Sequence, residues 1–128
     1  MIYVDASVIL AQLLGEGRRP PARLWQEPLV SSRLTVYEVW TRLNAHGLGA
    51  ALGDAARLAL GHLAMLELVQ PVLARALEPF PLAVRTLDAL HLASIEFLRG
   101  HGQPVMLAAY DRRLVDAART LGIKRYRL

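Results

Sequence analysis

Short apolar segments alternate with longer helical segments along nearly the whole chain, and this alternation restricts the fold most. Strand-like apolar segments occupy residues 2–4, 29–31, 66–69, 105–109 and 123–128. Helical periodicity predicts helices over 8–14, 33–46, 50–65 and 87–99, with a further helix beginning at 111. Strands joined by helical crossovers pair in parallel and are covered by those helices. We therefore expect an α/β sandwich with a mostly parallel central sheet of about five short strands.

The ends of the predicted helices carry residues that stop or cap a helix. Ser31 or Ser32 can cap the helix that follows them, and Gly47 provides its stop. Thr86 is the predicted cap of the helix over 87–99. Shorter helices are expected around Trp25 and after Pro71, so helical connections fill the spaces between strands.

Four acidic residues stand where a predicted strand ends or a predicted helix begins. Asp5 and Asp111 directly follow strand segments, whereas Glu38 and Asp88 lie in early turns of their helices. Ligand sites in open parallel sheets form beyond the carboxyl ends of the strands. The spacing therefore permits the four carboxylates to meet in one crevice, where a bound cation would offset their repulsion.

Each acid also has a simpler structural explanation. Asp5 and Asp111 can cap the helices that follow them, and Glu38 can pair with Arg42 four residues later. Asp88 can interact with the dipole of its helix or contact His91 one turn later. Considered singly, these explanations carry about as much weight as a metal site.

Composition limits the chemistry and the compartment. The 128 residues and 54% hydrophobic content suit a single domain over 1–128. No cationic leader precedes a short apolar block, and Arg57, His62 and Glu67 interrupt the apolar segment 55–69, so we expect a cytoplasmic protein without a membrane span. Because cysteine is absent, thiolate metal sites are excluded, and a carboxylate site favours Mg²⁺ or Mn²⁺.

The chain is basic, which favours a polyanionic partner. Its formal net charge is +4, and all fifteen cationic residues except Lys124 are arginine, whose planar group binds phosphate through two donors. An arginine-rich genome explains the same composition equally well. The candidates for contact with RNA phosphates are Arg18, Arg19, Arg112, Arg113, Lys124, Arg125 and Arg127.

Four phrases give the chain a resemblance to a known family. The segments IYVDASVIL, SSRLTVYEVWTRL, TLDALHLASIEFL and AAYDRRLVDAARTLG resemble those of PIN-domain nucleases in order and approximate spacing, most closely the VapC toxin ribonucleases of VapBC toxin–antitoxin modules. The resemblance implies one PIN-like nuclease domain over 1–128 that hydrolyses RNA with Mg²⁺ or Mn²⁺. It also implies an RNA substrate, a small VapB-like antitoxin and a homodimer.

The resemblance assigns the site residue by residue. Asp5, Glu38, Asp88 and Asp111 match the family's catalytic and metal-binding acids, and Asp116 is an auxiliary candidate. Ser7 matches a small polar residue beside the first acid. His91 is expected to pack or to support the acids rather than bind metal, because oxygen donors already suffice for these cations.

Two features of the sequence argue against assigning the family's nuclease function and its site residues to this chain unchanged. Ala109 stands where similar sequences often carry Thr or Ser, so a hydroxyl near the site is missing. Asp116 lies within one helical turn of Arg112 and Arg113 and can form surface ion pairs with them. The alternative function is therefore a PIN-like RNA-binding or regulatory module with little or no catalysis.

A phosphoacceptor receiver domain would also combine an α/β fold with acids beside Mg²⁺. It requires a phosphorylatable Asp after its central strand. The predicted third strand instead continues into Gln70 and Pro71, which disfavours this class.

Overall fold

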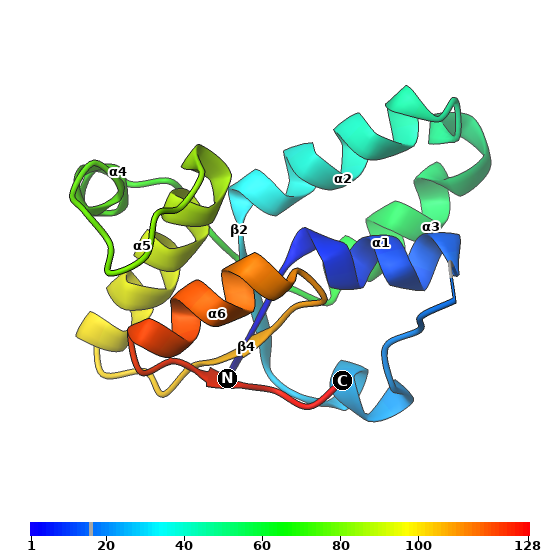
Figure 1. The fold of residues 1–128 in the computed structure, drawn as a ribbon. Helices are drawn as coiled ribbons and strands as arrows, with labels where there is room; N and C mark the ends of the chain where they lie inside the picture. The colour runs from blue at the N-terminus through cyan, green and yellow to red at the C-terminus, as the bar shows by residue number, and fades with distance from the viewer. Residues whose placement is uncertain (16) are drawn as a thin grey trace.

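A single parallel sheet forms the centre of the molecule in a computed structural model that describes residues 1–15 and 17–128. Its strand order is β3-β2-β1-β4-β5, and every neighbouring pair is parallel (Figure 1). The strands are β1 (Ile2–Val4), β2 (Leu29–Ser32), β3 (Ala64–Leu66), β4 (Met106–Ala108) and β5 (Lys124–Arg125). The predicted five-stranded, mostly parallel sheet is confirmed.

Six α-helices and one short 3-10 helix connect these strands in the described part of the chain. They are α1 (Ala6–Leu14), η1 (Ala22–Gln26), α2 (Arg33–Ala45), α3 (Gly49–Gly61), α4 (Gln70–Ala76), α5 (Thr86–Gly100) and α6 (Arg112–Thr120). In these residues, no helix is both long enough and apolar enough to cross a membrane.

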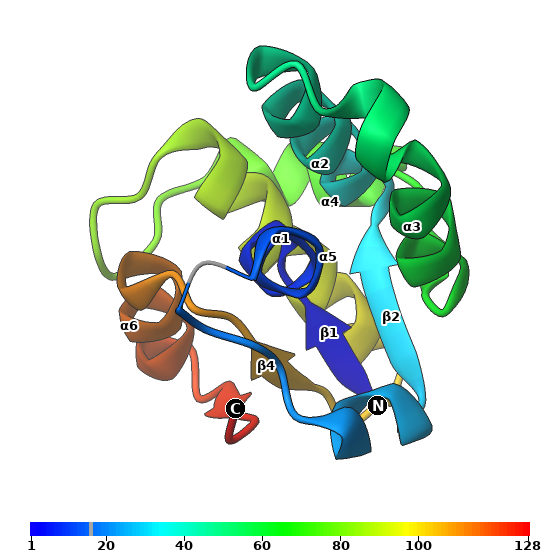
Figure 2. The same ribbon diagram turned by 90° about the vertical axis from the view of Figure 1, so that its right-hand side faces the viewer.

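The side chains of β1 alternate between two apolar clusters, one on each face of the sheet. Ile2 and Val4 pack with residues of α1, α2 and α3, whereas Tyr3 packs with residues of α5 and α6. Figures 1 and 2 accordingly show α1 and α5 on opposite sides of the sheet. This alternation follows from the two-residue period of a strand and gives the predicted sandwich.

Local side-chain hydrogen bonds fix where three of the helices begin. Ser32 accepts from the backbone N–H of Leu34 and caps α2, as predicted. Asp5 and Asp111 cap α1 and α6 in the same way. Because these two caps follow β1 and β4, helix capping also orients both carboxylates at one edge of the sheet.

Three sequence-based boundaries were wrong. The helix predicted over 50–65 ends at Gly61, because Ala64–Leu66 pair with β2. The third strand therefore begins two residues before the predicted segment 66–69 and overlaps it only at Leu66. Val69 is instead the N-cap residue of α4. Thr86 is the first residue of α5 rather than its cap, and Arg85 holds the cap position without a side-chain hydrogen bond.

The chain reverses its direction of travel across the sheet at β1. From β1 it proceeds through β2 to β3 on one side, and it later returns to β4 and β5 on the other side. Crevices form beside such a reversal, outside the carboxyl ends of the strands. Asp5 and Asp111 follow the two strands that flank it, so the fold predicts the site between them.

Candidate active site

Asp5 is a buried carboxylate held in one orientation by Ser7. Only 6% of Asp5 is exposed, and its Oδ2 accepts hydrogen bonds from the Ser7 backbone N–H at 3.1 Å and from the Ser7 hydroxyl at 2.6 Å. The Ser7 hydroxyl oxygen also accepts from the backbone N–H of Tyr110 at 3.0 Å. Ser7 therefore joins the end of β1 to the segment that follows β4.

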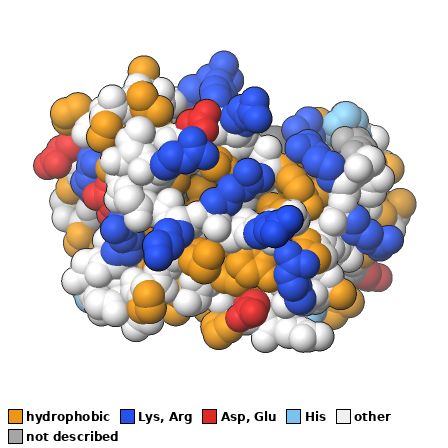
Figure 3. Space-filling view, turned by 60° about the horizontal axis from the view of Figure 1, so that its bottom comes forward, with side chains coloured by type: hydrophobic (Ala, Val, Ile, Leu, Met, Phe, Trp, Pro, Cys, Tyr) orange, Lys and Arg blue, Asp and Glu red, His pale blue; other side chains and the backbone are white. Residues whose placement is uncertain are grey.

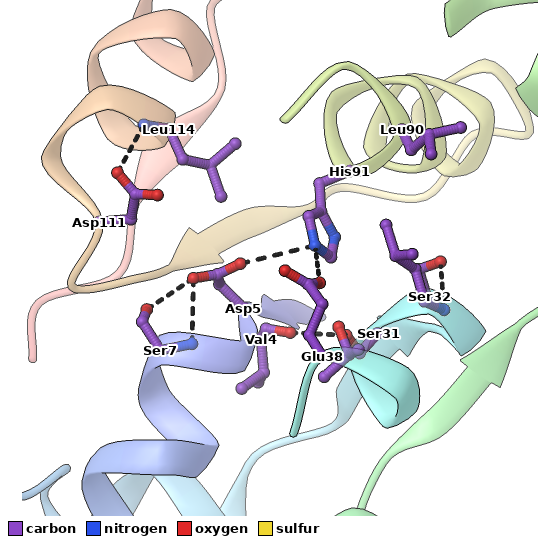
Figure 4. A network of polar contacts seen from close by, with 12 residues as sticks. Val4, Asp5, Ser7, Ser31, Ser32, Glu38, Leu90, His91, Asp111 and Leu114 are labelled. Atoms are coloured by element: carbon purple, nitrogen blue, oxygen red, sulfur yellow. Dashed lines mark hydrogen bonds and ion pairs between the residues drawn. The ribbon is translucent and has the colours of Figure 1, made fainter. Parts of the chain in front are cut away.

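A buried imidazole connects the first acid to the second. Nε2 of His91 lies 2.5 Å from Oε1 of Glu38 and 3.7 Å from Oδ1 of Asp5 (Figure 4). Because both neighbours are carboxylates, Nε2 carries a proton and donates to Glu38. Glu38 thus contacts His91 of α5 rather than Arg42, the alternative partner on its own helix.

Tyr3 supports the imidazole from the opposite side. Its hydroxyl lies 2.7 Å from Nδ1 of His91, and neither residue is exposed by more than 1%. The two rings meet edge to face, with 5.8 Å between their centroids. Tyr3, His91 and Glu38 thus form a continuous chain of hydrogen bonds that orients the Glu38 carboxylate.

Asp88 and Asp111 complete the acidic lining from the other side. Asp88 lies in the first turn of α5 and is 8% exposed. Asp111 accepts from the backbone N–H groups of Arg113 at 3.0 Å and Leu114 at 3.3 Å. Both therefore belong to the starts of helices, where backbone N–H groups favour negative charge.

One open cleft of about 540 Å³ contains all four acids. Asp5, Glu38, Asp88 and Asp111 line it together with Ser7 and His91, and Figure 4 labels all of these residues except Asp88. They come from the ends of β1 and β4 and from α1, α2 and α5. The helix-capping explanation is therefore compatible with a shared site, because Asp5 and Asp111 cap helices and still face one cleft.

Three ionisable side chains of this cleft, Asp5, Asp88 and His91, have raised pKa values. Burial, with a smaller contribution from Glu38, raises the pKa of Asp5 despite the stabilising effects of His91 and Ser7. Burial and the charge of Asp111 raise the pKa of Asp88. Burial by itself lowers the pKa of His91, but the hydrogen bond to Glu38 and the neighbouring carboxylates raise it above its usual value. The metal-free site therefore favours extra protons.

We expect the metal-free protein to lose stability as the pH rises above about 6.5, the usual pKa of histidine. The raised pKa of folded His91 stabilises the protein fully below that value, and this contribution is lost as the pH passes the folded pKa. The raised pKa values of Asp5 and Asp88 act in the same direction from about pH 4 upward. Thermal unfolding in chelating buffer between pH 6 and 9 measures this.

Glu38→Gln provides the control for that pH dependence. It removes the charge that holds the proton on His91, so its unfolding temperature should fall less steeply across the same range. A wild-type unfolding temperature that is constant or rises with pH would contradict the proposed charge distribution.

The chemistry of these donors fits a divalent cation, although the side chains do not meet at one point. Among residues 1–15 and 17–128, no three Asp, Glu or His groups are placed to hold one ion together. Mg²⁺, however, keeps several waters and usually binds through one or two carboxylates. Asp5, Asp88 and Asp111 are therefore suited to direct or water-bridged contacts, while Glu38 is already hydrogen-bonded to His91.

Asp116 lies apart from the four acids in this structure. It lines a neighbouring pocket with Tyr110 and several arginines, and its Oδ1 lies 3.6 Å from Nη1 of Arg119. The surface ion pair expected for Asp116 thus exists, but with Arg119 rather than with Arg112 or Arg113. Its role as an auxiliary metal ligand remains a prediction.

His91 supports the acids, which is one of the two roles expected for it, whereas the sequence interpretation omitted Tyr3. His91 lies three residues after Asp88, so helical spacing alone places both on one face of α5. Tyr3 carries no comparable signal, because an aromatic residue inside an apolar strand normally indicates core packing. Ala109 is fully buried in the apolar cluster with Tyr3, and the Ser7 hydroxyl supplies a hydroxyl beside Asp5.

Comparisons with known proteins show similarity over most of the chain. The family described as PIN domain matches residues 2–120. Ribonuclease VapC46 of Mycobacterium tuberculosis is 38% identical over 126 residues, covering 95% of this chain and 93% of the relative. Ribonuclease VapC47 of the same species is 29% identical over 129 residues, with the same two coverages.

Two solved structures share the fold at low sequence identity. The VapC20 toxin of M. tuberculosis, described as cleaving the sarcin–ricin loop, superposes with a TM-score of 0.72 at 23% identity over 100% of both chains. A chain from a toxin–antitoxin complex of Klebsiella pneumoniae gives 0.64 at 19% identity over 87% of both chains. These two similarities support the α/β/α architecture.

Proposed function

This chain belongs to the PIN domain family, and from that premise we propose that it is a metal-dependent endoribonuclease, the toxin of a toxin–antitoxin module. The observation that carries the proposal is the single cleft lined by Asp5, Glu38, Asp88 and Asp111. A relative named as a ribonuclease, 38% identical over nearly its whole length, supports the reaction class. RNA as substrate makes the cytoplasm the proposed compartment.

The proposed reaction is hydrolysis of an RNA phosphodiester bond by water. Mg²⁺ or Mn²⁺, when bound, would lower the pKa of water and balance negative charge on the phosphate. Asp5 contributes a carboxylate whose second oxygen is held by Ser7, so little reorganisation is needed. Asp88 and Asp111 contribute further oxygen donors across the cleft.

Glu38 is the proposed acceptor of the proton that the attacking water releases. Its Oε1 is held by His91, whose other nitrogen is held by Tyr3, so the carboxylate has a defined orientation. Its side chain is 22% exposed, which leaves it accessible from the cleft. A fixed and accessible carboxylate meets the geometric requirement for a general base.

Mapping RNA ends after brief expression tests this function and identifies the substrate. The wild-type protein is expected to create new RNA ends at one or a few sites, because an endonuclease with a defined cleft selects its substrate. Asp88→Asn should create none at comparable protein levels. New ends of equal abundance with both proteins would contradict the assignment.

A PIN-like RNA-binding or regulatory module is the alternative. It gains support from Ala109, where similar sequences often carry a hydroxyl. It predicts RNA bound without new ends, so the same experiment separates the two functions if bound RNA is recovered with the protein.

The proposed partners are a small antitoxin near the acidic cleft and a second copy of the chain. Helices α1 and α2 contribute mainly to the core, because Val8, Ile9, Val39 and Leu43 are fully buried. Exposed leucines lie on or next to α4, on the segment between α4 and α5, and at the start of α5: Leu73, Leu77, Leu82 and Leu87. We propose this second surface for the homodimer, since exposed apolar patches often mark interfaces.

Leu77→Glu should weaken the proposed dimer, because Leu77 is 89% exposed and a charge there would have to be buried on association. Light scattering during gel filtration should give twice the 14.1 kDa chain mass for the wild type and a concentration-dependent decrease for the variant. Leu58→Glu, at a 71% exposed residue of α3, is the matched control. A monomeric wild type, or dissociation only with Leu58→Glu, would contradict this interface.

A further inference from the structure

We infer that a pocket beside the acidic cleft, rich in arginine, binds a phosphate of the same RNA strand, next to the one that is cut. This inference rests on the proposed ribonuclease function and assigns a substrate subsite to it. The pocket measures about 470 Å³ and is lined by Arg18, Tyr110, Arg112, Val115, Asp116, Arg119 and Arg125.

Charge distinguishes this pocket from the cleft that holds the acids. Four guanidinium groups face a single carboxylate, that of Asp116, which pairs with Arg119 at 3.6 Å. The pocket therefore has three more positive groups than negative ones, and this excess positive charge attracts an anion. Figure 3 shows the face formed by the elements at the bottom of Figure 1, and Lys and Arg side chains clearly outnumber acidic ones across it.

Separate elements bring these arginines together. Arg112 and Arg119 lie two turns apart on one face of α6, Arg125 lies on the edge strand β5, and Arg18 follows α1. The Arg18 guanidinium sits 4.9 Å from the centroid of the Tyr110 ring, which holds this side chain over the pocket. Arginine groups held in this way are suited to phosphate oxygens.

The pocket and the cleft share one stretch of backbone. Tyr110 lines the pocket and Asp111 lines the cleft, and the next residue, Arg112, lines the pocket again. The backbone N–H of Tyr110 donates to the Ser7 hydroxyl, which itself donates to Asp5. A strand whose scissile phosphate lies in the cleft can therefore place a neighbouring phosphate in the pocket without leaving the surface.

Binding of single-stranded RNA to the Asp5→Asn protein tests this subsite without cleavage. Arg18→Gln, Arg112→Gln and Arg125→Gln should each weaken affinity several-fold and reduce the slope of log affinity against log salt by about 0.7, the value for one phosphate contact. Arg57→Gln is the matched control, because Arg57 also stacks on an aromatic ring, that of Trp40, but lies on α3. Thermal melts verify that all four variants fold.

Shortening the RNA locates the contact. Removing nucleotides from one end should eventually reduce affinity as much as Arg112→Gln does, and the substitution should then have no further effect. Equal losses for Arg57→Gln and the pocket variants, or an arginine effect that is unchanged on every shortened RNA, would overturn the subsite. Cleavage by the wild-type protein is measured separately, so absent cleavage with intact arginine-dependent binding would overturn the ribonuclease function alone.

Asp116→Asn should raise the affinity for RNA, whereas replacement of the pocket arginines should lower it. It removes the one carboxylate of the pocket, so RNA should bind the Asp5→Asn protein more tightly when Asp116 is also replaced. Unchanged or weaker binding would contradict an anion site at this position.

Discussion

Asp5→Asn is expected to lower the rate of RNA cleavage by at least about 100-fold, equivalent to roughly 3 kcal/mol of lost transition-state stabilisation. Asp5 is the most buried of the four acids, with 6% exposed, and both of its oxygens face polar groups of the site. Asparagine keeps the shape and one oxygen acceptor but removes the negative charge. The measurement is single-turnover cleavage of an RNA identified by end mapping.

The same substitution should leave the metal-free protein as stable as the wild type or make it more stable. Burial raises the pKa of Asp5, so the folded protein already favours the neutral carboxyl group that asparagine imitates. Asp54→Asn is the control, because Asp54 is fully exposed on α3 and pairs only with Arg57 among the ion pairs of the described residues. Unchanged cleavage by Asp5→Asn, or slower cleavage that is explained by a lower unfolding temperature, would contradict the proposed role.

Removal of divalent cations should abolish cleavage, and Mg²⁺ or Mn²⁺ should restore it. Four carboxylates share the cleft, and burial and repulsion already raise the pKa of Asp5 and Asp88 when no cation is present. A divalent cation would neutralise this charge and bind the folded state. At one hundred times its dissociation constant it would stabilise the protein by about 2.7 kcal/mol.

Thermal melts with and without Mn²⁺ separate a catalytic cation from one that only binds RNA. The unfolding temperature of the wild type should rise with Mn²⁺ in the absence of RNA, and that of Asp5→Asn should rise less. Asp54→Asn should respond like the wild type. Full cleavage in chelating buffer would contradict metal dependence, and equal stabilisation of Asp5→Asn would contradict the location of the cation.

Periodicity predicted the fold well where an element is buried on a continuous face. β1 and α5 satisfy this condition, because their side chains pack into the core on fixed periods. The prediction failed around β3, an edge strand of half-buried and exposed residues whose limits depend on pairing with β2. Such pairing is a long-range property, and local apolar residues alone placed the strand too late.

The candidate site was predictable as a set of acids but not as a network. Helix starts and strand ends indicated where Asp5, Glu38, Asp88 and Asp111 would lie, and the family resemblance then assigned them to one site. The imidazole between Asp5 and Glu38 depends on how α5 packs against α2, which no local pattern encodes. Similarly, Arg119 joins the arginine-rich pocket only because α6 lies beside Arg18 and Arg125.

The most direct test of the central proposal, that the four acids form one metal-dependent ribonuclease centre, is anomalous diffraction from crystals grown with Mn²⁺. We predict an anomalous peak in the cleft at coordination distance from a carboxylate oxygen of Asp5, Asp88 or Asp111, or separated from it by one water. Crystals of Asp5→Asn should show a weaker peak or none. A peak of full strength elsewhere in the molecule, with an empty cleft, would contradict the proposal.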